Sequence, residues 1–453
     1  MPAFDPRTVL ATIRGRPGLR RALSQTLLGS LVLQASLMAS GVAVARTLGP
    51  VDRGHFALLT LVASLVTQIG AMGIPQALTY SVSRMPPLSV AVLRTMVRPI
   101  GAHLLAASLA CAALLMAMTL DRPSYVQAGA IMTVGVIAPV IAQRCGLGVL
   151  QGLKRFRQLN LMRIAPYVLY AAAVSAVVLS GRGSFLAIAL AWVSAQLLLV
   201  PVTLTAAWRA ARAAGTGSTQ PPGAAWLLRF GRRSVFGAGP AVETYRVDQA
   251  VVAFFLPPAA LGYYVVALAF TNLPRIVSRG VSIVASPLIA GYVSHGQARR
   301  GMWRLFWLAA PVYSSLAAAL WAFAPDLTRI FFGEEFLRSA PVTRVLLLAT
   351  VLFCARRVLI EGARAAGYPG LASAAEVVAL VAVAPLFALL VPDQGIMGVA
   401  YALVASSALA LAVLIVSLLI APRRWGIPRA WIETDQTKLA AAVEEPPIDA
   451  TPG

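Results

Sequence analysis

Hydrophobic residues along the chain are gathered into long blocks that charged, proline-rich or glycine-rich breaks separate. Each block has about 20 residues, the length that an α-helix needs to cross a bilayer core roughly 30 Å thick. The blocks are too long for strands of a membrane barrel, and they lack the alternation of such strands. The pattern predicts twelve membrane-spanning helices, at about 24–46, 56–81, 100–120, 125–150, 160–180, 185–207, 234–256, 262–288, 304–324, 341–360, 369–391 and 396–420.

The overall composition supports an all-α polytopic membrane protein. Of the 453 residues, 59% are hydrophobic and only 12% are charged, whereas an average soluble domain is about half apolar and one quarter charged. The basic N-terminus lacks the apolar core of a cleavable signal peptide, so we expect the first span to direct membrane insertion.

The charge is strongly unbalanced, with 38 Lys and Arg against 16 Asp and Glu and a net charge of +22. In a soluble protein this excess would suggest nucleic acid as a partner. If the N-terminus is cytoplasmic, 28 of the 38 basic residues fall on that side, seven fall outside and three lie within spans. This asymmetry is the positive-inside pattern of membrane proteins. We therefore expect both termini in the cytoplasm and no nucleic acid partner.

A basic, glycine- and proline-rich interruption at the midpoint divides the chain into two halves. The tail after the last span is rich in acidic residues and proline, which favours disorder. The predicted organisation is a basic cytoplasmic N-terminus (1–22), a six-helix bundle (23–207), a cytoplasmic linker (208–233), a second six-helix bundle (234–421) and a disordered cytoplasmic tail (422–453).

The two halves carry a weak internal repeat at an offset of 208 residues. The matching pairs are Leu48/Leu256, Pro50/Pro258, Gly54/Gly262 and Phe56/Tyr264. Both segments join an outward-going span to a returning one, so the halves share one topology. Halves of this kind are related by a pseudo-two-fold axis along the membrane normal and enclose a cavity at their interface.

Charged residues inside spans are candidates for function, because the bilayer makes them costly and they rarely face lipid. The seventh span contains Glu243, Arg246 and Asp248. Glu243 and Arg246 are three residues apart and can pair on one helix face. The alternative to a functional role is a neutralised cluster that holds the helix in place.

The eighth span contains Arg275 and Arg279, whose spacing of four residues puts both guanidinium groups on one helix face. The repeat aligns Arg275 with Thr67, deep in the second span, which argues against an interfacial position. Because no acidic residue lies near them in sequence, we expect both arginines to line a cavity and bind an anion. A guanidinium group binds phosphate in a bidentate manner, which suits a diphosphate.

Glu376 stands alone in the eleventh span, either facing the cavity as a carboxylate that takes up protons or lying near water at the cytoplasmic end. The three cysteines lie in apolar blocks, and no histidine pair has metal-ligand spacing, so neither a metal nor another cofactor is predicted. No phosphate-binding glycine loop, nucleophile motif or long outer loop is visible, so the chain is not expected to be an enzyme.

Three stretches resemble the oligosaccharide flippases, the Wzx-type polysaccharide transporters of the multidrug/oligosaccharidyl-lipid/polysaccharide exporter superfamily. They are ARTLGPVDRGHFALL, YRVDQAVVAFFLPPAALGYYVVALAF and FFGEEFLRSA, and the resemblance extends from the first span to about residue 420. In the seventh span, Arg246 and Asp248 match the family's Arg-x-Asp pattern. Arg275 and Arg279 match no motif, so their predicted role rests on the physical argument.

The resemblance implies two six-helix bundles around a cationic cavity that opens to either membrane face in turn. It implies that the protein moves an oligosaccharide on a polyprenyl diphosphate from the cytoplasmic to the outer leaflet of a bacterial plasma (inner) membrane, for cell-surface polysaccharide biosynthesis. Arg246, Arg275 and Arg279 would hold the diphosphate, and Glu243, Asp248 or Glu376 would couple the cycle to protons or cations. The expected partners are the lipid-linked glycan, membrane lipid, a polysaccharide polymerase and glycosyltransferases.

Three other functions remain open. A cation-coupled multidrug antiporter of the same superfamily would favour a cavity with net negative charge. A membrane glycan polymerase or glycosyltransferase would favour a long acidic outer loop, whereas the acidic loop around 325–344 is short. A membrane scaffold for cytoplasmic enzymes would not require arginines within spans.

Overall fold

The computed structural model describes residues 17–215, 217, 221–235, 241–290 and 295–420, and within those ranges every regular element is helical. The first half contains α2 (Pro17–Gly70), α3 (Ile74–Arg84), the 3-10 turn η1 (Pro86–Leu88), α4 (Ser89–Thr119), α5 (Ser124–Gly152), α6 (Phe156–Leu179), α7 (Phe185–Ala213) and α8 (Ala224–Val235). The second half contains α9 (Ala241–Thr244), α10 (Val247–Phe255), α11 (Pro258–Ala290), α12 (His295–Ala322), α13 (Ala324–Phe332), the 3-10 turn η2 (Glu334–Phe336), α14 (Ser339–Ala365) and α15 (Pro369–Ile420). The predicted helical class is confirmed.

Eight of the described helices are long and apolar enough to cross a membrane. Two of them, α2 and α15, each run through two predicted spans and bend between them. The bends lie at Gly49 (φ 68°) and Gly395 (φ 55°), where the backbone enters a left-handed region that glycine adopts without a steric penalty. The predicted span 341–360 is the single helix α14. The described residues thus include helical segments along all twelve predicted spans.

Two of the predicted spans are interrupted, which the hydrophobic pattern does not reveal. In the second, the helix ends at Gly70 and resumes as α3 after Gly73, whose φ is 72°. A methyl group at Gly73 would overlap the carbonyl oxygen of Gly231 in α8, so this turn requires glycine for close packing as well. In the seventh span, Arg246 (φ 46°) separates α9 from α10.

The predicted linker 208–233 is helical at both of its ends, because α7 continues to Ala213 and α8 occupies the last part. The α8 helix packs on α3 through aromatic rings, with the Tyr80 and Phe230 ring centroids 4.5 Å apart and Trp226 stacked on Phe230. Most of the predicted N-terminal segment 1–22 and the whole predicted tail 422–453 lie outside the described residues.

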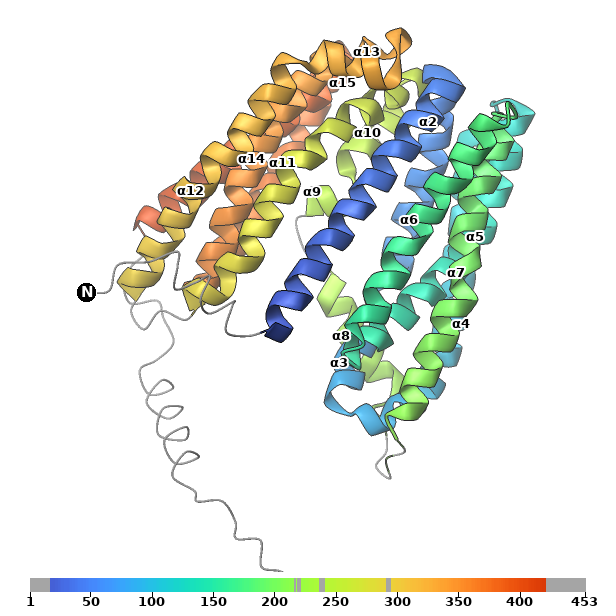
Figure 1. The fold of residues 1–453 in the computed structure, drawn as a ribbon, viewed down its shortest axis with the longest axis vertical. Helices are drawn as coiled ribbons and strands as arrows, with labels where there is room; N and C mark the ends of the chain where they lie inside the picture. The colour runs from blue at the N-terminus through green and yellow to red at the C-terminus, as the bar shows by residue number, and fades with distance from the viewer. Residues whose placement is uncertain (1–16, 216, 218–220, 236–240, 291–294, 421–453) are drawn as a thin grey trace, which may run out of the picture.

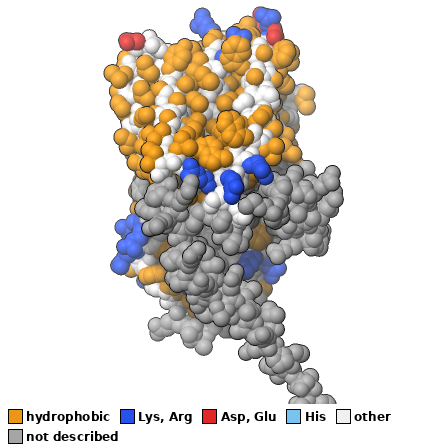
Figure 2. All heavy atoms as spheres, turned by 90° about the vertical axis from the view of Figure 1, so that its left-hand side faces the viewer, with side chains coloured by type: hydrophobic (Ala, Val, Ile, Leu, Met, Phe, Trp, Pro, Cys, Tyr) orange, Lys and Arg blue, Asp and Glu red, His pale blue; other side chains and the backbone are white. Residues whose placement is uncertain are grey.

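The outer surface has the hydrophobic character that a lipid environment requires. Figure 2 shows a broad band of hydrophobic side chains on one face of the molecule, with basic side chains beyond its edges. On α12, the exposed side chains include Trp307, Leu308 and Val312. A soluble protein rarely exposes so large an apolar surface, and helices satisfy their backbone hydrogen bonds within lipid. The protein is an all-α polytopic membrane protein.

The two halves lie side by side, with α2 and α11 facing each other along their boundary (Figure 1). At the end that contains Gly49 and Gly395, one hydrophobic core includes side chains from both halves, such as Phe56 and Tyr264. At the opposite end, each half has a core of its own, one within residues 74–227 and the other within 289–418. The halves are therefore joined at the first end, which the charge pattern predicts to face outside, and separate at the other.

The joined end is closed by the residues of the 208-residue repeat. Gly54 packs against the carbonyl oxygen of Pro258, and Gly262 packs against the carbonyl oxygen of Pro50 so tightly that a methyl group at either glycine would overlap that oxygen. This reciprocal contact is the one that a two-fold axis between equivalent helices produces. Arg46 of the first half also donates hydrogen bonds to backbone carbonyls at the end of α13 in the second half.

Candidate functional site

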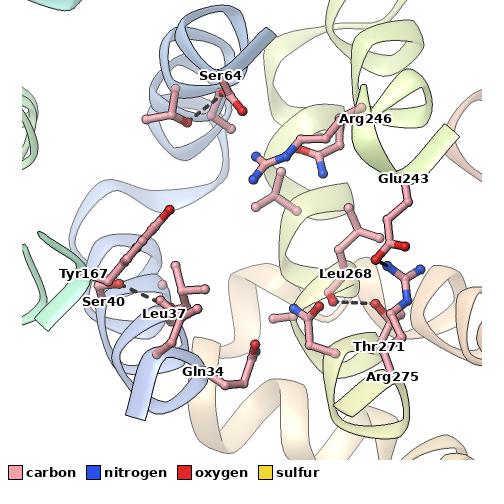
Figure 3. A pocket seen from close by; sticks show the side chains of 18 of the residues that line it. Gln34, Leu37, Ser40, Ser64, Tyr167, Glu243, Arg246, Leu268, Thr271 and Arg275 are labelled. Carbon is pink, nitrogen blue, oxygen red and sulfur yellow. Dashed lines mark hydrogen bonds and ion pairs between the residues drawn. The ribbon is translucent and has the colours of Figure 1, made fainter. Parts of the chain in front are cut away.

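A large cavity of about 710 Å³ lies between the two halves and is lined by both of them. Figure 3 shows Gln34, Leu37 and Ser40 of α2 on one side of it. Glu243 and Arg275, from α9 and α11, lie on the opposite side. The volume falls within the range of roughly 300–1,000 Å³ that is typical of sites for small molecules. The walls mix apolar side chains with amide, hydroxyl and guanidinium groups, so the cavity can hold a polar ligand.

Arginine dominates the charge of this cavity. Seven arginines and two acidic residues are among its described lining residues, namely Arg53, Arg144, Arg163, Arg246, Arg275, Arg279 and Arg356 with Glu243 and Asp248. The first three come from the first half and the others from the second half. Because guanidinium groups stay protonated in proteins, the cavity has a large excess of positive charge.

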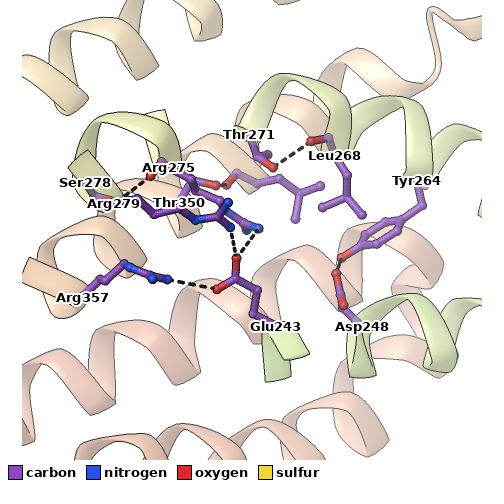
Figure 4. Close-up of polar contacts among 11 residues, drawn as sticks. Glu243, Asp248, Tyr264, Leu268, Thr271, Arg275, Ser278, Arg279, Thr350 and Arg357 are labelled. Atoms are coloured by element: carbon purple, nitrogen blue, oxygen red, sulfur yellow. Dashed lines mark hydrogen bonds and ion pairs between the residues drawn. The ribbon is translucent and has the colours of Figure 1, made fainter. Parts of the chain in front are cut away.

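Three guanidinium groups converge on the Glu243 carboxylate (Figure 4). Arg279 Nη2 lies 2.7 Å from Oε1 and donates a hydrogen bond to it, and Arg275 Nη1 lies 3.9 Å from the same oxygen. Arg357 Nη1 of α14 lies 3.6 Å from Oε2. Spacing of four residues on α11 brings the first two arginines to one helix face, as the sequence predicts.

Asp248 lies in a different environment from Glu243, although both line the cavity. Its side chain is buried, and the hydroxyl of fully buried Tyr264 donates a 2.8 Å hydrogen bond to Asp248 Oδ2. This contact joins α10 to α11 at the seventh and eighth predicted spans, so Asp248 holds the two helices together (Figure 4).

Glu376 of α15 is paired with Arg356 of α14 rather than standing alone. Arg356 Nε lies 3.6 Å from Glu376 Oε1, and the Arg356 side chain is only 3% exposed. Glu376 itself is not among the described lining residues of the cavity. The Phe353 ring lies next to two guanidinium groups, with Arg356 Cζ 5.6 Å and Arg275 Cζ 5.1 Å from its centroid. A guanidinium group that lies over the face of an aromatic ring is attracted to that ring.

The structure brings together most of the charged residues that the sequence selects. Arg246, Arg275 and Arg279 all line the cavity. The expected pair between Glu243 and Arg246 is wrong, because the helix breaks at Arg246 and Glu243 instead reaches α11 and α14. Arg275 and Arg279 have no acidic residue near them in sequence, and in the fold they are paired with Glu243.

Four arginines of the cavity were not selected from the sequence, because they lie near the ends of predicted spans and were counted with the adjoining membrane surfaces. The charge pattern places Arg53 outside and Arg144, Arg163 and Arg356 in the cytoplasm, but all four line the cavity. One signal could have identified Arg144, since the apolar residues continue beyond it to the end of α5 at Gly152. Its Nη1 donates a 2.6 Å hydrogen bond to Gln68 Oε1 of α2, which holds the guanidinium group in place.

Potential metal ligands do not gather in the described part of the chain. No group of three or more His, Cys, Asp and Glu side chains there could hold a metal ion. The three cysteines are free and buried.

Comparison with solved structures identifies the fold. The lipid II flippase MurJ, in an inward closed conformation, has a TM-score of 0.70 with 12% sequence identity, and the match covers 93% of each chain. An inward-facing multidrug resistance MATE family transporter of the MOP superfamily has a TM-score of 0.66 with 14% identity, covering 92% of this chain and 96% of that one. A MOP superfamily transporter from Pyrococcus furiosus, described by the reverse polarity of its binding pocket, has a TM-score of 0.54 with 13% identity, covering 88% and 94%. At these identities the likeness establishes a shared fold.

Sequence comparison identifies the family. No curated protein sequence matches the chain. The model of a family described as polysaccharide biosynthesis protein matches residues 43–341, about two thirds of the chain, including α11 with Arg275 and Arg279. The matched region also contains most of the arginine-rich cavity lining. The chain belongs to this polysaccharide biosynthesis protein family.

Proposed function

We propose that the protein is a flippase for an oligosaccharide linked to a polyprenyl diphosphate, which it moves from the cytoplasmic to the outer leaflet. The observation that carries the proposal is the arginine excess in the cavity between the halves. Positive charge gathered in a cavity within the membrane is costly unless an anion compensates it. A diphosphate supplies several negative charges and the oxygens that guanidinium groups bind in a bidentate manner.

The positions of the arginines support a ligand held between both halves. Arg275 and Arg279 on α11, with Arg246 at the helix break, would bind the diphosphate. Arg144 and Arg163 reach the cavity from α5 and α6, so the first half would also contact an anion bound there. The amide and hydroxyl groups in the walls suit the hydroxyl-rich glycan, and the lipid tail would stay in the bilayer.

The unequal joining of the halves supports transport by alternating access. The halves share a core at the predicted outer end and have separate cores at the predicted cytoplasmic end. Rocking of the halves around the cavity would then open one end as the other closes, as in other transporters built from repeats. A ligand that binds one conformation more tightly shifts this equilibrium without any covalent step, so the proposed activity is not enzymatic.

The charge of the cavity distinguishes this proposal from a multidrug antiporter for organic cations. Such a substrate would meet seven arginines and two carboxylates, of which Glu243 is already shared by three guanidinium groups. Like charges in a site of this kind repel a cation. Glu243 and Asp248 remain candidates for ion coupling in the cavity, and Glu376 is a candidate beside it. Glycosyltransferases and a polymerase would supply and consume the proposed substrate at a bacterial inner membrane.

Reconstitution tests the proposal directly. The purified protein is placed in liposomes with a fluorescent polyprenyl-diphosphate oligosaccharide, and access of the label to a membrane-impermeant quencher reports transfer between leaflets. Arg275→Ala combined with Arg279→Ala is expected to abolish transfer. The matched control is Arg94→Ala with Arg98→Ala, an exposed pair of the same spacing on α4 outside the cavity. Full transfer by the first double variant would refute the diphosphate site.

A further inference from the structure

Three arginines surround the single carboxylate of Glu243, so positive charge exceeds negative charge in this cluster. Arg275, Arg279 and Arg357 surround one carboxylate at 3.9, 2.7 and 3.6 Å, which leaves a net charge of +2 on the four groups. The side chain of Glu243 is 22% exposed, so part of the cluster remains open to the cavity. The carboxylate therefore satisfies the cluster only in part.

The hydrogen-bond donors of the cluster also exceed its acceptors. Each guanidinium group has five N–H donors, whereas a carboxylate has two oxygens. The Nε atoms of Arg275 and Arg357 are buried and have no hydrogen-bond partner in the described structure. Buried donors without partners are unfavourable. An anion with more oxygens and more charge than a carboxylate would satisfy the same arginines better.

Glu243 is carried by a separate and much shorter element than Arg275 and Arg279. It lies on α9, a single helical turn of four residues. The left-handed backbone of Arg246 interrupts the helix between α9 and α10, whereas Arg275 and Arg279 belong to the long helix α11. A short turn is held by few backbone hydrogen bonds. Displacement of the carboxylate from the arginines would thus require a change in this short turn and none in α11.

We propose that Glu243 is an internal competitor for the anion site and thereby determines which anions the cavity accepts. The inference rests on the proposed function and deepens it by specifying the charge class of the ligand. When the cavity is empty, the Glu243 carboxylate occupies the position of one phosphate group. A diphosphate displaces it, because a diphosphate offers several charges and oxygens to the three guanidinium groups.

The competitor makes the site selective against the most abundant anions of a membrane. A phosphodiester headgroup has a single negative charge, so exchanging Glu243 for it gains no charge. Specificity of this kind comes from a cost imposed on the wrong ligand as well as from contacts to the right one. Occupation of the site by Glu243 multiplies the apparent affinity of every anion by the fraction of molecules in which the site is free. A polyanion, which binds the three arginines more strongly, still binds measurably after this loss, whereas an anion with a single charge does not.

The test measures anion binding by the purified full-length protein with isothermal titration calorimetry at low ionic strength. The probes are inorganic pyrophosphate and dimethyl phosphate, a phosphodiester with a single charge. Wild type is expected to bind pyrophosphate and not dimethyl phosphate. Glu243→Gln is expected to bind pyrophosphate at least tenfold more tightly and to bind dimethyl phosphate measurably. Glu243→Asp keeps the charge on a shorter side chain, so its affinity for pyrophosphate is expected to lie between those of wild type and Glu243→Gln. This variant replaces Glu243→Gln in the test if Glu243→Gln does not fold.

The matched control is Glu361→Gln, which removes a carboxylate paired with Arg364 at 3.0 Å outside the cavity and should leave both affinities unchanged. If Glu243→Gln and Glu243→Asp bind pyrophosphate no more tightly than wild type, Glu243 does not compete for the anion site. Pyrophosphate binding by wild type would in that case still support the proposed function. Absence of pyrophosphate binding in wild type and both variants would overturn the competitor and the diphosphate site together.

Discussion

Replacing Gly262 by alanine is expected to open the joined end of the protein. A methyl group there would overlap the carbonyl oxygen of Pro50, and it would lie 3.1 Å from the carbonyl carbon of Pro50 and 3.3 Å from the Gly54 nitrogen. These neighbours are backbone atoms, so no side chain can rotate to make room. The contact joins α2 to α11, so a separation of these two helices relieves the overlap.

The size of the effect follows from the cost of overpacking, which is typically about 1–3 kcal/mol per site. At about 2 kcal/mol, the ratio of closed to open molecules falls about 30-fold. A population that is 99:1 in favour of the closed form would become about 3:1. The open fraction thus changes from a trace to about one quarter, which distance measurements resolve.

Double electron–electron resonance between two spin labels measures the opening. Leu179→Cys and Phe323→Cys place labels on exposed positions of opposite halves near the joined end, and the three native cysteines are buried. Gly262→Ala should add a longer distance to the distribution. Gly101→Ala is the control, because a methyl group at Gly101 meets no atom within 4 Å. If the distance distribution of folded Gly262→Ala equals that of wild type, close packing at Gly262 does not hold the joined end closed.

Three further substitutions test other contacts. Glu376→Gln removes the partner of buried Arg356 at 3.6 Å and should lower the thermal stability of the detergent-purified protein, since breaking a buried ion pair costs about 3–5 kcal/mol. Tyr264→Phe leaves buried Asp248 without its 2.8 Å hydrogen bond, and a loss of about 1–3 kcal/mol should appear in the same thermal melts. Arg46→Ala removes hydrogen bonds between the halves and should lengthen the spin-label distances, as Gly262→Ala does.

Each of these outcomes has a comparison that would contradict it. Glu361→Gln, which breaks an exposed pair, should melt like wild type, and equal melting of Glu376→Gln would argue that Arg356 has found another partner. A stability for Tyr264→Phe equal to that of wild type would show that Asp248 does not need the hydroxyl. Unchanged distances in Arg46→Ala would show that its hydrogen bonds do not hold the joined end closed.

The elements that the sequence predicts well are those governed by local hydrophobicity. Block length and the absence of alternation predict helices, and the described helices follow all twelve predicted spans. The places where the prediction fails are backbone breaks inside apolar segments, at Gly73 and Arg246. Gly73 packs directly against Gly231 of another element, and a hydrophobic pattern contains no record of such a contact.

The candidate site was predictable only in part. Arg275 and Arg279 were identified because charge within an apolar block is unusual and spacing of four residues places both on one face. Their link to Glu243 was not, since 32 residues or more separate them along the chain and two different helices bring them together. Arg53 and Arg144 were assigned to the membrane surfaces, because a one-dimensional charge count cannot separate a surface arginine from one that reaches inward.

The amino-acid sequence by itself determined that the chain crosses a membrane as helices, that its halves repeat and that two arginines lie where lipid cannot accept them. These conclusions depend on the energy of transferring each side chain into a bilayer, which is a local property. The tertiary structure decided which charges meet. It placed seven arginines around one cavity, gave three of them a shared carboxylate and closed one end with the paired glycines. Packing between distant segments fixes these distances, and so only the folded chain contains them.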